Sequence, residues 1–528
     1  MLIDARSLPT NQILETDVCI IGAGAAGISV AAELANAPFR VLLVESGGTE
    51  FRHRTQLLYR GENSGRPYPP LEFTKRRQFG GTTKTWFGRC RPLDEIDFEE
   101  RSWLPHSGWP IVKKDLDPYY ARAHALCELG AYDYQAGQSD SMIESSGLET
   151  KVFRFSPPTD FGQTYLDSLH QAANIRLILQ ANAIKIALDP EGRQVSSIEC
   201  KTIAKNKFSI RAKIFILAAS ALEITRMLLV SNDVHANGVG NQYDLVGRYF
   251  MEHPHVFSGT LVDIPAGFPP QFLKLNYEAK QKNLGVVHAL GIPESRMRKE
   301  KLSNGSLFLV SRPIYKTEDR YYSKDLADFL QVMDVLQHTT APTLSAVKNM
   351  GRSLFHIPKI SNTLLQIARH KIRPSSQYAI RFQVETVPNP SSRVTLSDQK
   401  DALGINRIRL HWELSPQDLD SFHRLEELTY MGLNRLGVQV KKINHALAAD
   451  GWPVSMLPGK HHMGTTRMHT NPHMGVVDEN CLVHGVNNLY IAGSSIFPTS
   501  GMANPTLTIV ALAIRLAERV KQVMAAGG

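Results

Sequence analysis

The first fifty residues alternate between apolar runs and small residues in an order typical of a nucleotide-binding unit. Residues 18–21 (VCII) are a short apolar run of the kind found in a buried strand, and residues 25–34 are rich in alanine. A second apolar run at residues 40–44 leads into Glu45. This order predicts a strand, a helix and a second strand, the βαβ unit of an α/β fold.

Later apolar runs predict the return of the same sheet. Residues 175–189 (IRLILQANAIKIALD) indicate two paired strands, residues 213–220 (KIFILAAS) a further strand, and residues 221–231 a helix. Near the end of the chain, residues 489–492 predict another strand that leads into a Gly-Ser turn. Asn504 and Pro505 then suit the N-cap and first turn of a final helix.

The pattern changes between residues 257 and 450. This region predicts an antiparallel sheet with helices on it, which would form a substrate domain. Its strand-like pieces lie at residues 257–264, 306–314, 378–387 and 407–414. Between them, residues 320–372 are helical in pattern and mix basic with apolar side chains. That insertion is either a lid or packing element or a surface for a membrane or partner.

Composition limits the alternatives. A chain of 528 residues is too long for one ordinary core and suggests two or three domains, or one large domain with a second layer. The net charge of +9 comes without a long basic run, so we expect a solvated surface and no nucleic-acid partner. Residues 485–514, the longest uncharged stretch, contain two prolines and do not predict a membrane span. The N-terminus lacks a secretory pattern, and the five cysteines are scattered, so we expect a reduced, cytoplasmic protein.

Gly22, Gly24 and Gly27 form a G-x-G-x-x-G motif between the first strand and its helix. The first glycine allows the tight turn, the second lets the backbone approach a pyrophosphate, and the third brings helix and sheet together. The helix N-terminus offers free N–H groups to the phosphates. Glu45, at the end of the second strand, suits the two hydroxyls of a ribose and disfavours NADP. The motif therefore predicts a bound dinucleotide, either FAD or NAD.

Two further segments carry candidate chemistry. Residues 79–94 (FGGTTKTWFGRCRPLD) contain a second glycine-rich turn, which either lies along a pyrophosphate or flavin or is only a turn. Residues 461–478 (HHMGTTRMHTNPHMGVVD) contain four histidines. Metal binding fits these histidines poorly, because no H-E-x-x-H or C-x-x-C pattern accompanies them and His461 and His462 are adjacent. We expect no metal site.

These motifs together resemble those of the glucose–methanol–choline (GMC) oxidoreductases, which are FAD-dependent. The similarity covers the front motif, GGTT at 80–83, GRYFMEHP at 247–254, and the H-x-x-G-T-x-R-M and A-N-P-T-x-T motifs of the tail. It implies a Rossmann-like FAD domain built from both chain ends, at residues 1–256 (with a flavin-covering loop at 60–110) and 451–528. It places a substrate domain at residues 257–450.

The resemblance also assigns roles. His461 corresponds to the family's catalytic base and Asn504 to its partner, whereas His462, His469, His473 and His484 receive no such role. GGTTKTW is similar to the sugar-oxidising side of the family, where a flavin-linking histidine stands at the position of Thr85, so we expect non-covalent FAD. The motifs and the resemblance together assign the cofactor contacts to Gly22, Gly24, Ala25, Gly27, Glu45, Ser46, Gly80, Gly81, Thr82, Thr83, Trp86, Ala183, Ile184, Ala218, Gly493, Ser494, Asn504, Pro505 and Thr506. Most relatives have an Asp at the turn of Gly493 and Ser494, which this chain lacks.

The implied reaction is oxidation of a CH–OH group to a carbonyl. His461 would accept the hydroxyl proton while hydride passes to flavin N5, and oxygen or another acceptor would reoxidise the flavin. The GGTTKTW segment favours a sugar, glycoside or cyclitol as substrate. Two alternatives stay open: oxidation of a sterol, lipid-like or other apolar alcohol at a membrane surface, and a non-redox lyase or isomerase that contains a flavin.

Overall fold

The computed structural model describes residues 1–135, 140–157, 159–273, 285–311, 377–442 and 447–526. Its centre is a six-stranded parallel sheet in the order β1-β8-β4-β3-β12-β21. The strands are β1 (Leu2–Asp4), β3 (Val18–Ile21), β4 (Val41–Val44), β8 (Ile175–Leu179), β12 (Ile214–Leu217) and β21 (Leu489–Ile491). Every residue of the three strands β3, β4 and β12 is buried, as expected for a parallel sheet with both faces covered. The predicted strand–helix–strand unit is confirmed.

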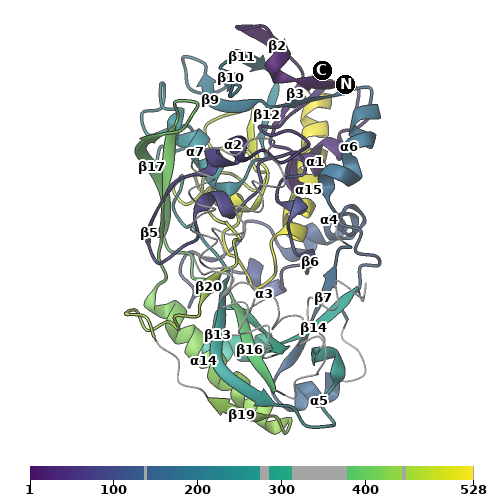
Figure 1. Ribbon diagram of the computed structural model, residues 1–528, viewed down its shortest axis with the longest axis vertical. Helices are drawn as coiled ribbons and strands as arrows, with labels where there is room; N and C mark the ends of the chain where they lie inside the picture. Colours follow the sequence, from purple (N-terminus) through teal and green to yellow (C-terminus); the bar gives the residue numbers. More distant parts are fainter. Residues whose placement is uncertain (136–139, 158, 274–284, 312–376, 443–446, 527–528) are drawn as a thin grey trace, which may run out of the picture.

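Helices from opposite ends of the chain cover this sheet. The yellow C-terminal helix α15 lies beside the purple N-terminal helix α1 (Figure 1); α15 also packs against α4, and α1 against α6. The bounds are α1 (Ala25–Glu33), α4 (Lys113–Leu126), α6 (Phe161–Gln171), α7 (Ala221–Val230) and α15 (Thr506–Ala526). The sheet and these helices share one hydrophobic core, so both chain ends build one layered unit.

A small sheet in the order β2-β11-β10-β9 borders the parallel sheet. Its strands are β2 (Gln12–Glu15), β9 (Asn182–Leu188), β10 (Val195–Lys201) and β11 (Lys207–Arg211). The prediction that residues 175–189 form two strands paired with each other is therefore wrong. Strand β8 has both edges occupied by β1 and β4, and Gln180, with φ at 61°, turns the chain into the second sheet.

The lower half of the molecule in Figure 1 is built on an antiparallel sheet in the order β19-β13-β16-β15-β14-β7-β6, with β20 beside β13. The strands are β6 (Arg89–Cys90), β7 (Glu149–Phe155), β13 (Pro254–Asp263), β14 (Val286–Gly291), β15 (Gly305–Ser311), β16 (Gln377–Val384), β19 (Gln439–Lys442) and β20 (Leu457–Pro458). The predicted antiparallel sheet is confirmed. Strands β6 and β7 come from the first 256 residues, so the first part of the chain contributes two strands to this sheet. The predicted domain limits stay predictions.

Residues 407–414 do not join that sheet, contrary to the prediction. They form β18 (Asn406–Trp412), which pairs with β17 (Arg393–Lys400) and, in parallel, with β5 (Glu62–Gly65). Both β17 and β18 pack against α7, one of the helices that share a core with the parallel sheet. The predicted helical insertion at residues 320–372 lies outside the described residues.

The other helices complete the described chain. The remaining α-helices are α2 (His53–Gln56), α3 (Glu95–Phe98), α5 (Asp140–Ser145), α9 (Glu294–Glu300) and α14 (Pro416–Arg435). The 3₁₀ helices are η1 (Ala5–Ser7), η2 (Leu57–Tyr59), η3 (Leu71–Phe73), η4 (Gly81–Lys84), η5 (Pro270–Leu273) and η6 (Ser494–Ile496). Within the described ranges, no helix combines the length and the apolar character needed to cross a bilayer.

Candidate active site

The glycine motif forms the tight turn that its spacing predicts. Gly22 has φ at 108°, and a Cβ there would lie 2.7 Å from the carbonyl oxygen of Ala218. A Cβ on Gly27 would lie 1.8 Å from the carbonyl oxygen of Gly22, so helix α1 approaches the turn as closely as backbone allows. Gly24 has no atom within 4 Å of a Cβ position, which leaves space in front of the N-terminus of α1. That open space fits a pyrophosphate.

The second glycine-rich turn lies directly on the first. The amide of Gly80 donates to the carbonyl oxygen of Ala23 at 2.8 Å, and a Cβ on Gly81 would come within 2.9 Å of the Cα of Gly24. We call these five residues (Gly22, Gly24, Gly27, Gly80, Gly81) the glycine cradle. Thr83 supports it by donating from Oγ1 to the carbonyl oxygen of Gly80 at 2.6 Å. Two segments more than fifty residues apart therefore make one continuous backbone surface.

Glu45 is fixed at the edge of the glycine cradle. Its carboxylate is buried and accepts hydrogen bonds from the amides of Ala23 (3.0 Å) and Gly47 (2.7 Å) and from the hydroxyl of Ser46 (3.0 Å). A carboxylate has about four acceptor positions, so capacity remains for one ribose hydroxyl. The residues at this end therefore fit the ribose of a dinucleotide, and that contact stays a prediction.

The cofactor contacts predicted for the tail lie beside the N-terminus of α15. The helix begins at Thr506, directly after Pro505. Asn504 was predicted to be the N-cap and instead lies one residue before it. Its side chain hydrogen-bonds to His461 and Arg89. Ser494, which follows Gly493, donates to the carbonyl oxygen of His462 at 2.7 Å. This turn therefore links the histidine segment to the parallel sheet.

Four further predicted cofactor contacts are Ala218, Ala183, Ile184 and Trp86. Ala218 lies against Gly22 and Gly27, and its contact with a cofactor stays a prediction. Ala183 and Ile184 lie on β9, in the small bordering sheet, and their contact with a cofactor stays a prediction. Trp86 is half-buried and donates from its indole to the carbonyl oxygen of Thr159 at 2.9 Å.

Three chain segments meet at His461. Its Nε2 lies 3.2 Å from the side-chain nitrogen of Asn504, and its Nδ1 lies 2.9 Å from Nδ1 of His253. The ring of His255 is also close, with its centroid 6.1 Å from that of His461. We call His253, His255, His461 and Asn504 the imidazole cluster. The structure brings the predicted pair of His461 and Asn504 together, and its catalytic role stays a prediction.

The imidazole cluster is arranged for uncharged rings. Burial, together with the neighbouring His253 and His255, holds the pKa of His461 well below the usual 6.5. Burial likewise lowers the pKa of His253 to about 4 and that of His255 well below its usual value. A neutral imidazole has a lone pair that can accept a proton, so His461 is in the form that a general base requires at pH 7.

Arg89 on β6 orients Asn504. Its Nε donates to Oδ1 of Asn504 at 3.1 Å, and its Nη2 donates to the side-chain oxygen of Gln383 on β16. Because the amide oxygen of Asn504 accepts from Arg89, the amide NH₂ is the end that faces His461. The guanidinium also lies over the ring of Phe308, 4.3 Å from its centroid.

His462 has a different environment from its neighbour. It is buried, and its Nε2 lies 2.9 Å from the hydroxyl of Tyr68, which donates to Glu252. The other carboxylate oxygen of Glu252 accepts from the backbone amide of His461 at 2.8 Å. Burial raises the pKa of Glu252 to about 7. Glu252 therefore holds the backbone of the candidate base, and His462 contacts this carboxylate through Tyr68.

A buried ion pair lies behind the loop that carries Asn504. Arg101 and Glu385 form a bidentate pair with N–O distances of 2.6 and 2.7 Å, and neither side chain is exposed. Glu385 also accepts from the amide of Gly501 at 3.3 Å. Thr499 donates to the carbonyl oxygen of Asp97 at 2.6 Å. The segment before Asn504 is thus held by buried polar contacts.

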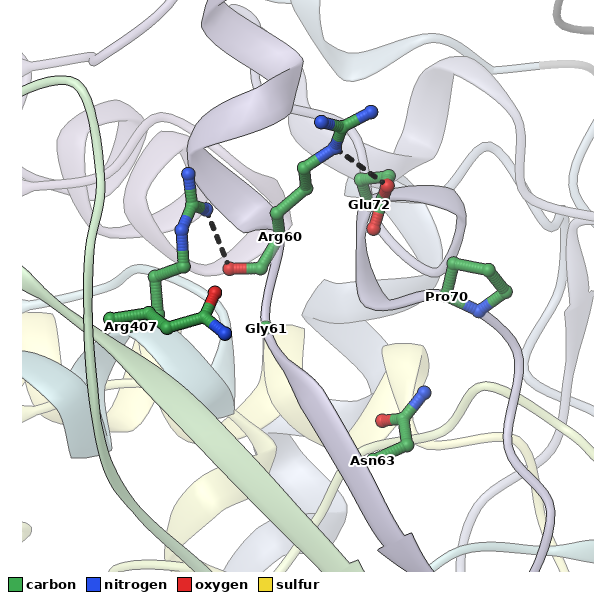
Figure 2. Close-up of a pocket in the computed structure, with 7 residues that line it drawn as sticks. Arg60, Gly61, Asn63, Pro70, Glu72 and Arg407 are labelled. Carbon is green, nitrogen blue, oxygen red and sulfur yellow. Dashed lines mark hydrogen bonds and ion pairs between the residues drawn. The ribbon is translucent and has the colours of Figure 1, made fainter.

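A separate pocket opens on the surface (Figure 2). Its lining residues are Arg60, Gly61, Asn63, Pro70, Glu72, Gln399 and Arg407. Arg60 donates to the carboxylate of Glu72 at 3.1 Å, and Arg407 donates to the carbonyl oxygen of Arg60 at 2.9 Å. None of these seven residues belongs to the imidazole cluster, so the pocket is not the candidate active site.

Four residues of the site were not predicted from the sequence: His253, His255, Glu252 and Arg89. The first three lie in or beside the segment GRYFMEHP, which had carried only the family resemblance. The spacing of His253 and His255 was an available signal, because alternate residues of an extended segment point to one face. Nothing local indicates Arg89, whose role depends on strand β6 joining the far sheet. Within the described ranges, no group of three or more His, Cys, Asp or Glu side chains is arranged to hold a metal ion.

Comparisons with known proteins agree with this geometry. Residues 17–228, which include all of the glycine cradle, match the model of the FAD dependent oxidoreductases. Residues 388–513, which include His461 and Asn504, match a C-terminal domain model described as GMC oxidoreductase.

Relatives match along nearly the whole chain. A 2-methyl-1,2-propanediol dehydrogenase of Mycolicibacterium austroafricanum is 21% identical over 97% of this chain and 96% of its own. The fructose dehydrogenase large subunit of Gluconobacter japonicus is 22% identical over 97% of this chain and 98% of its own. The crystal structure of pyridoxine 4-oxidase from Mesorbium loti shares the fold, with a TM-score of 0.59, 17% identity, and coverage of 95% of this chain and 98% of that one.

The fold, the glycine cradle and these matches define a flavoprotein, an FAD-dependent oxidoreductase. The tail motifs and the second domain model specify it further: residues 388–513 match the C-terminal domain of the GMC oxidoreductases.

Proposed function

We propose that the protein oxidises a CH–OH group of a small polyol, sugar or glycoside to a carbonyl, with His461 as the base. The observation that carries this proposal is the contact between Nε2 of His461 and the amide of Asn504, beside the N-terminus of α15. FAD, when bound, supplies the acceptor for the hydride that leaves the carbon.

Each member of the pair has a defined task. The substrate hydroxyl replaces the NH₂ of Asn504 as the donor to Nε2 of His461, and Nε2 takes its proton as the C–H bond breaks. The NH₂ of Asn504 donates to the same substrate oxygen and holds it in place. A placed imidazole base contributes about 10²–10⁴-fold in rate. The fixed orientation of the alcohol contributes separately.

The preference for a polyol or sugar has support in His255. Its Nε2 atom is buried and makes no hydrogen bond within the described part of the chain. A buried nitrogen of this kind is stabilised by a polar ligand group and destabilised by an apolar one. A second hydroxyl beside the oxidised carbon would supply that group. The names of the two full-length relatives, a diol dehydrogenase and a fructose dehydrogenase, agree with this substrate class.

We also propose that FAD is held without a covalent bond. The position of the family's linking histidine is Thr85, which is exposed and hydrogen-bonds locally to Thr82. A threonine hydroxyl does not form that link. Denaturation in acid should release all of the flavin into the supernatant, and retention of flavin on the precipitated chain would contradict the proposal.

The direct test is an anaerobic titration of the purified flavoprotein with sugars, glycosides, cyclitols, short diols and sterols, followed by air. Bleaching of the flavin band by a polyol or sugar, but not by sterols, supports the proposal. Bleaching only by sterols would favour the apolar-alcohol alternative. Conversion of a substrate while the flavin stays oxidised would favour the lyase or isomerase alternative. Rapid return of colour in air identifies oxygen as the acceptor, and slow return identifies another one.

A further inference from the structure

The ring of His253 joins the candidate base to a backbone carbonyl. His253 is fully buried, directly before strand β13. Its Nδ1 lies 2.9 Å from Nδ1 of His461. Its Nε2 lies 2.9 Å from the carbonyl oxygen of Gly501 and 3.3 Å from that of Ser500. Each ring nitrogen of His253 therefore has a hydrogen-bond partner.

The carbonyl partners determine where His253 carries its proton. A carbonyl oxygen only accepts hydrogen bonds, so Nε2 of His253 must be the N–H donor. A neutral imidazole has one N–H, which leaves Nδ1 of His253 as an acceptor. The ring is neutral near pH 7, since burial lowers its pKa to about 4.

The tautomer of His461 follows. The contact between the two Nδ1 atoms needs one proton, and His253 has none to give at that position. Nδ1 of His461 is therefore the N–H, and its lone pair is at Nε2. The other end of the ring agrees, because the NH₂ of Asn504 faces Nε2 and needs an acceptor there. Two independent partners thus require the same tautomer.

We propose that His253 is a positioning residue, which holds His461 in the tautomer whose Nε2 lone pair faces the substrate. This inference rests on the proposed function, in which Nε2 accepts the hydroxyl proton. In Ser-His-Asp sites a carboxylate fixes the tautomer of the histidine. Here an imidazole anchored on the Gly501 carbonyl does so, and it adds no negative charge beside the base.

The nearby acid does not take this role. The carboxylate of Glu252 accepts from the backbone amide of His461 and from the hydroxyl of Tyr68, rather than from the ring of His461. A carboxylate at the ring would raise the pKa of His461, whereas the observed surroundings lower it. The tautomer is therefore fixed without weakening the neutral state of the base.

Two variants of the holoenzyme test this role. In His253→Leu the ring of His461 loses its Nδ1 acceptor, and both tautomers become populated. In His253→Asn a side-chain oxygen near the former Nδ1 position can accept again. We expect anaerobic flavin reduction by a substrate to slow by about 10²-fold in His253→Leu, the lower end of the contribution of a base, with at least a tenfold recovery in His253→Asn. The exposed His473→Leu is the matched control and should match the wild type.

A readout other than turnover makes the test decisive. Nitrogen NMR of protein labelled with ¹⁵N-histidine distinguishes protonated from bare ring nitrogens, and the His461 signals are those missing in His461→Gln. We expect the wild type to show His461 protonated at Nδ1 and bare at Nε2. A wild-type ring protonated at Nε2 would overturn the inference, even where His253→Leu fails to fold. An unchanged reduction rate in a folded His253→Leu would overturn it too.

The outcomes separate this inference from the proposed function. If His461→Gln reduces its flavin as fast as the wild type, His461 is not the base and the proposed function fails. If His461→Gln is slow but His253→Leu is fast, only the positioning role of His253 fails.

Discussion

The glycine cradle and the imidazole cluster differ in the atoms that form them, backbone in the first and side chains in the second. The cradle is made of backbone, and its glycines are required because a Cβ would collide with backbone atoms at 1.8 to 2.9 Å at Gly22, Gly27, Gly80 and Gly81. The cluster is made of side chains, and His461 meets His253 and Asn504 across separations of 208 and 43 residues. Each turn of the cradle is therefore encoded by a local glycine motif, whereas the candidate chemistry depends on how the two halves of the molecule join.

The buried pair of Arg101 and Glu385 gives the largest expected effect on stability, on the cluster side of the comparison. Arg101→Leu leaves Glu385 charged and without its partner in the interior. We expect the free energy of unfolding to fall by about 3–5 kcal/mol, measured by denaturant titration. The double variant Arg101→Leu/Glu385→Leu should recover part of this loss. A single variant as stable as the wild type would show that the pair does not hold the cluster.

Gly27→Ala tests the rigidity of the cradle. The new methyl group would lie 1.8 Å from the carbonyl oxygen of Gly22, so helix α1 must move away from the sheet. We expect a loss of about 1–3 kcal/mol in the free energy of unfolding, the usual cost of overpacking, as well as lower flavin content. A variant with wild-type stability would contradict the close approach of helix and turn.

Gly24→Ala is the matched change within the same motif. No atom lies within 4 Å of the new methyl group, so the fold should tolerate it. The methyl would occupy the space in front of α1, and we expect weaker FAD binding with the unfolding free energy of the apoprotein unchanged. Flavin content and apoprotein stability, measured together, separate the two glycines. Full flavin content would show that the cofactor does not approach Gly24.

The pH dependence of kcat/KM examines the charge state of the cluster. Protonated His461 cannot accept a proton, and its pKa is held well below 6.5 by burial and by the neighbouring imidazoles. Activity therefore depends on the neutral form, which persists as the pH falls through 6.5. We expect His461 to cause no decline in kcat/KM between pH 8 and 6.5, so that any decline in that range comes from the Glu252 carboxyl, whose pKa burial raises to about 7. An acidic limb centred at or above pH 6.5 that persists in Glu252→Gln would contradict this.

Arg60→Ala gives the smallest expected effect, because Arg60 belongs to neither the glycine cradle nor the imidazole cluster. Its pair with Glu72 is at the surface pocket, and half of the arginine side chain is exposed. Exposed ion pairs contribute about 0–1 kcal/mol. We expect a change within that range in thermal unfolding and no change in flavin content or activity. A marked loss of activity would show that the surface pocket contributes to the reaction.

The same contrast explains which features the sequence could predict. The strand at residues 18–21, the helix after it and Glu45 were predicted because spacing and periodicity are local properties. The pairing of residues 175–189 was wrong because β8 finds β1 and β4 as neighbours, which no local pattern reveals. The strand at residues 407–414 was placed in the wrong sheet for the same reason, since its partner β5 is about 345 residues earlier.

The candidate site divides in the same way. His461 and Asn504 were predicted through motifs of the tail, and the structure brings them within hydrogen-bond distance. His253 was missed, although its segment had been noticed, because its role depends on the carbonyl of Gly501 and the ring of His461. Arg89 was missed because its strand, β6, contributes to a sheet built mainly from later residues.

The central claim is that His461 is the base of an alcohol oxidation. The most direct measurement is the rate of anaerobic flavin reduction in His461→Gln, at saturating substrate and equal FAD content, relative to the wild type. The account predicts a rate lower by about 10²–10⁴-fold with the FAD still bound. A rate within a few-fold of the wild type would contradict it.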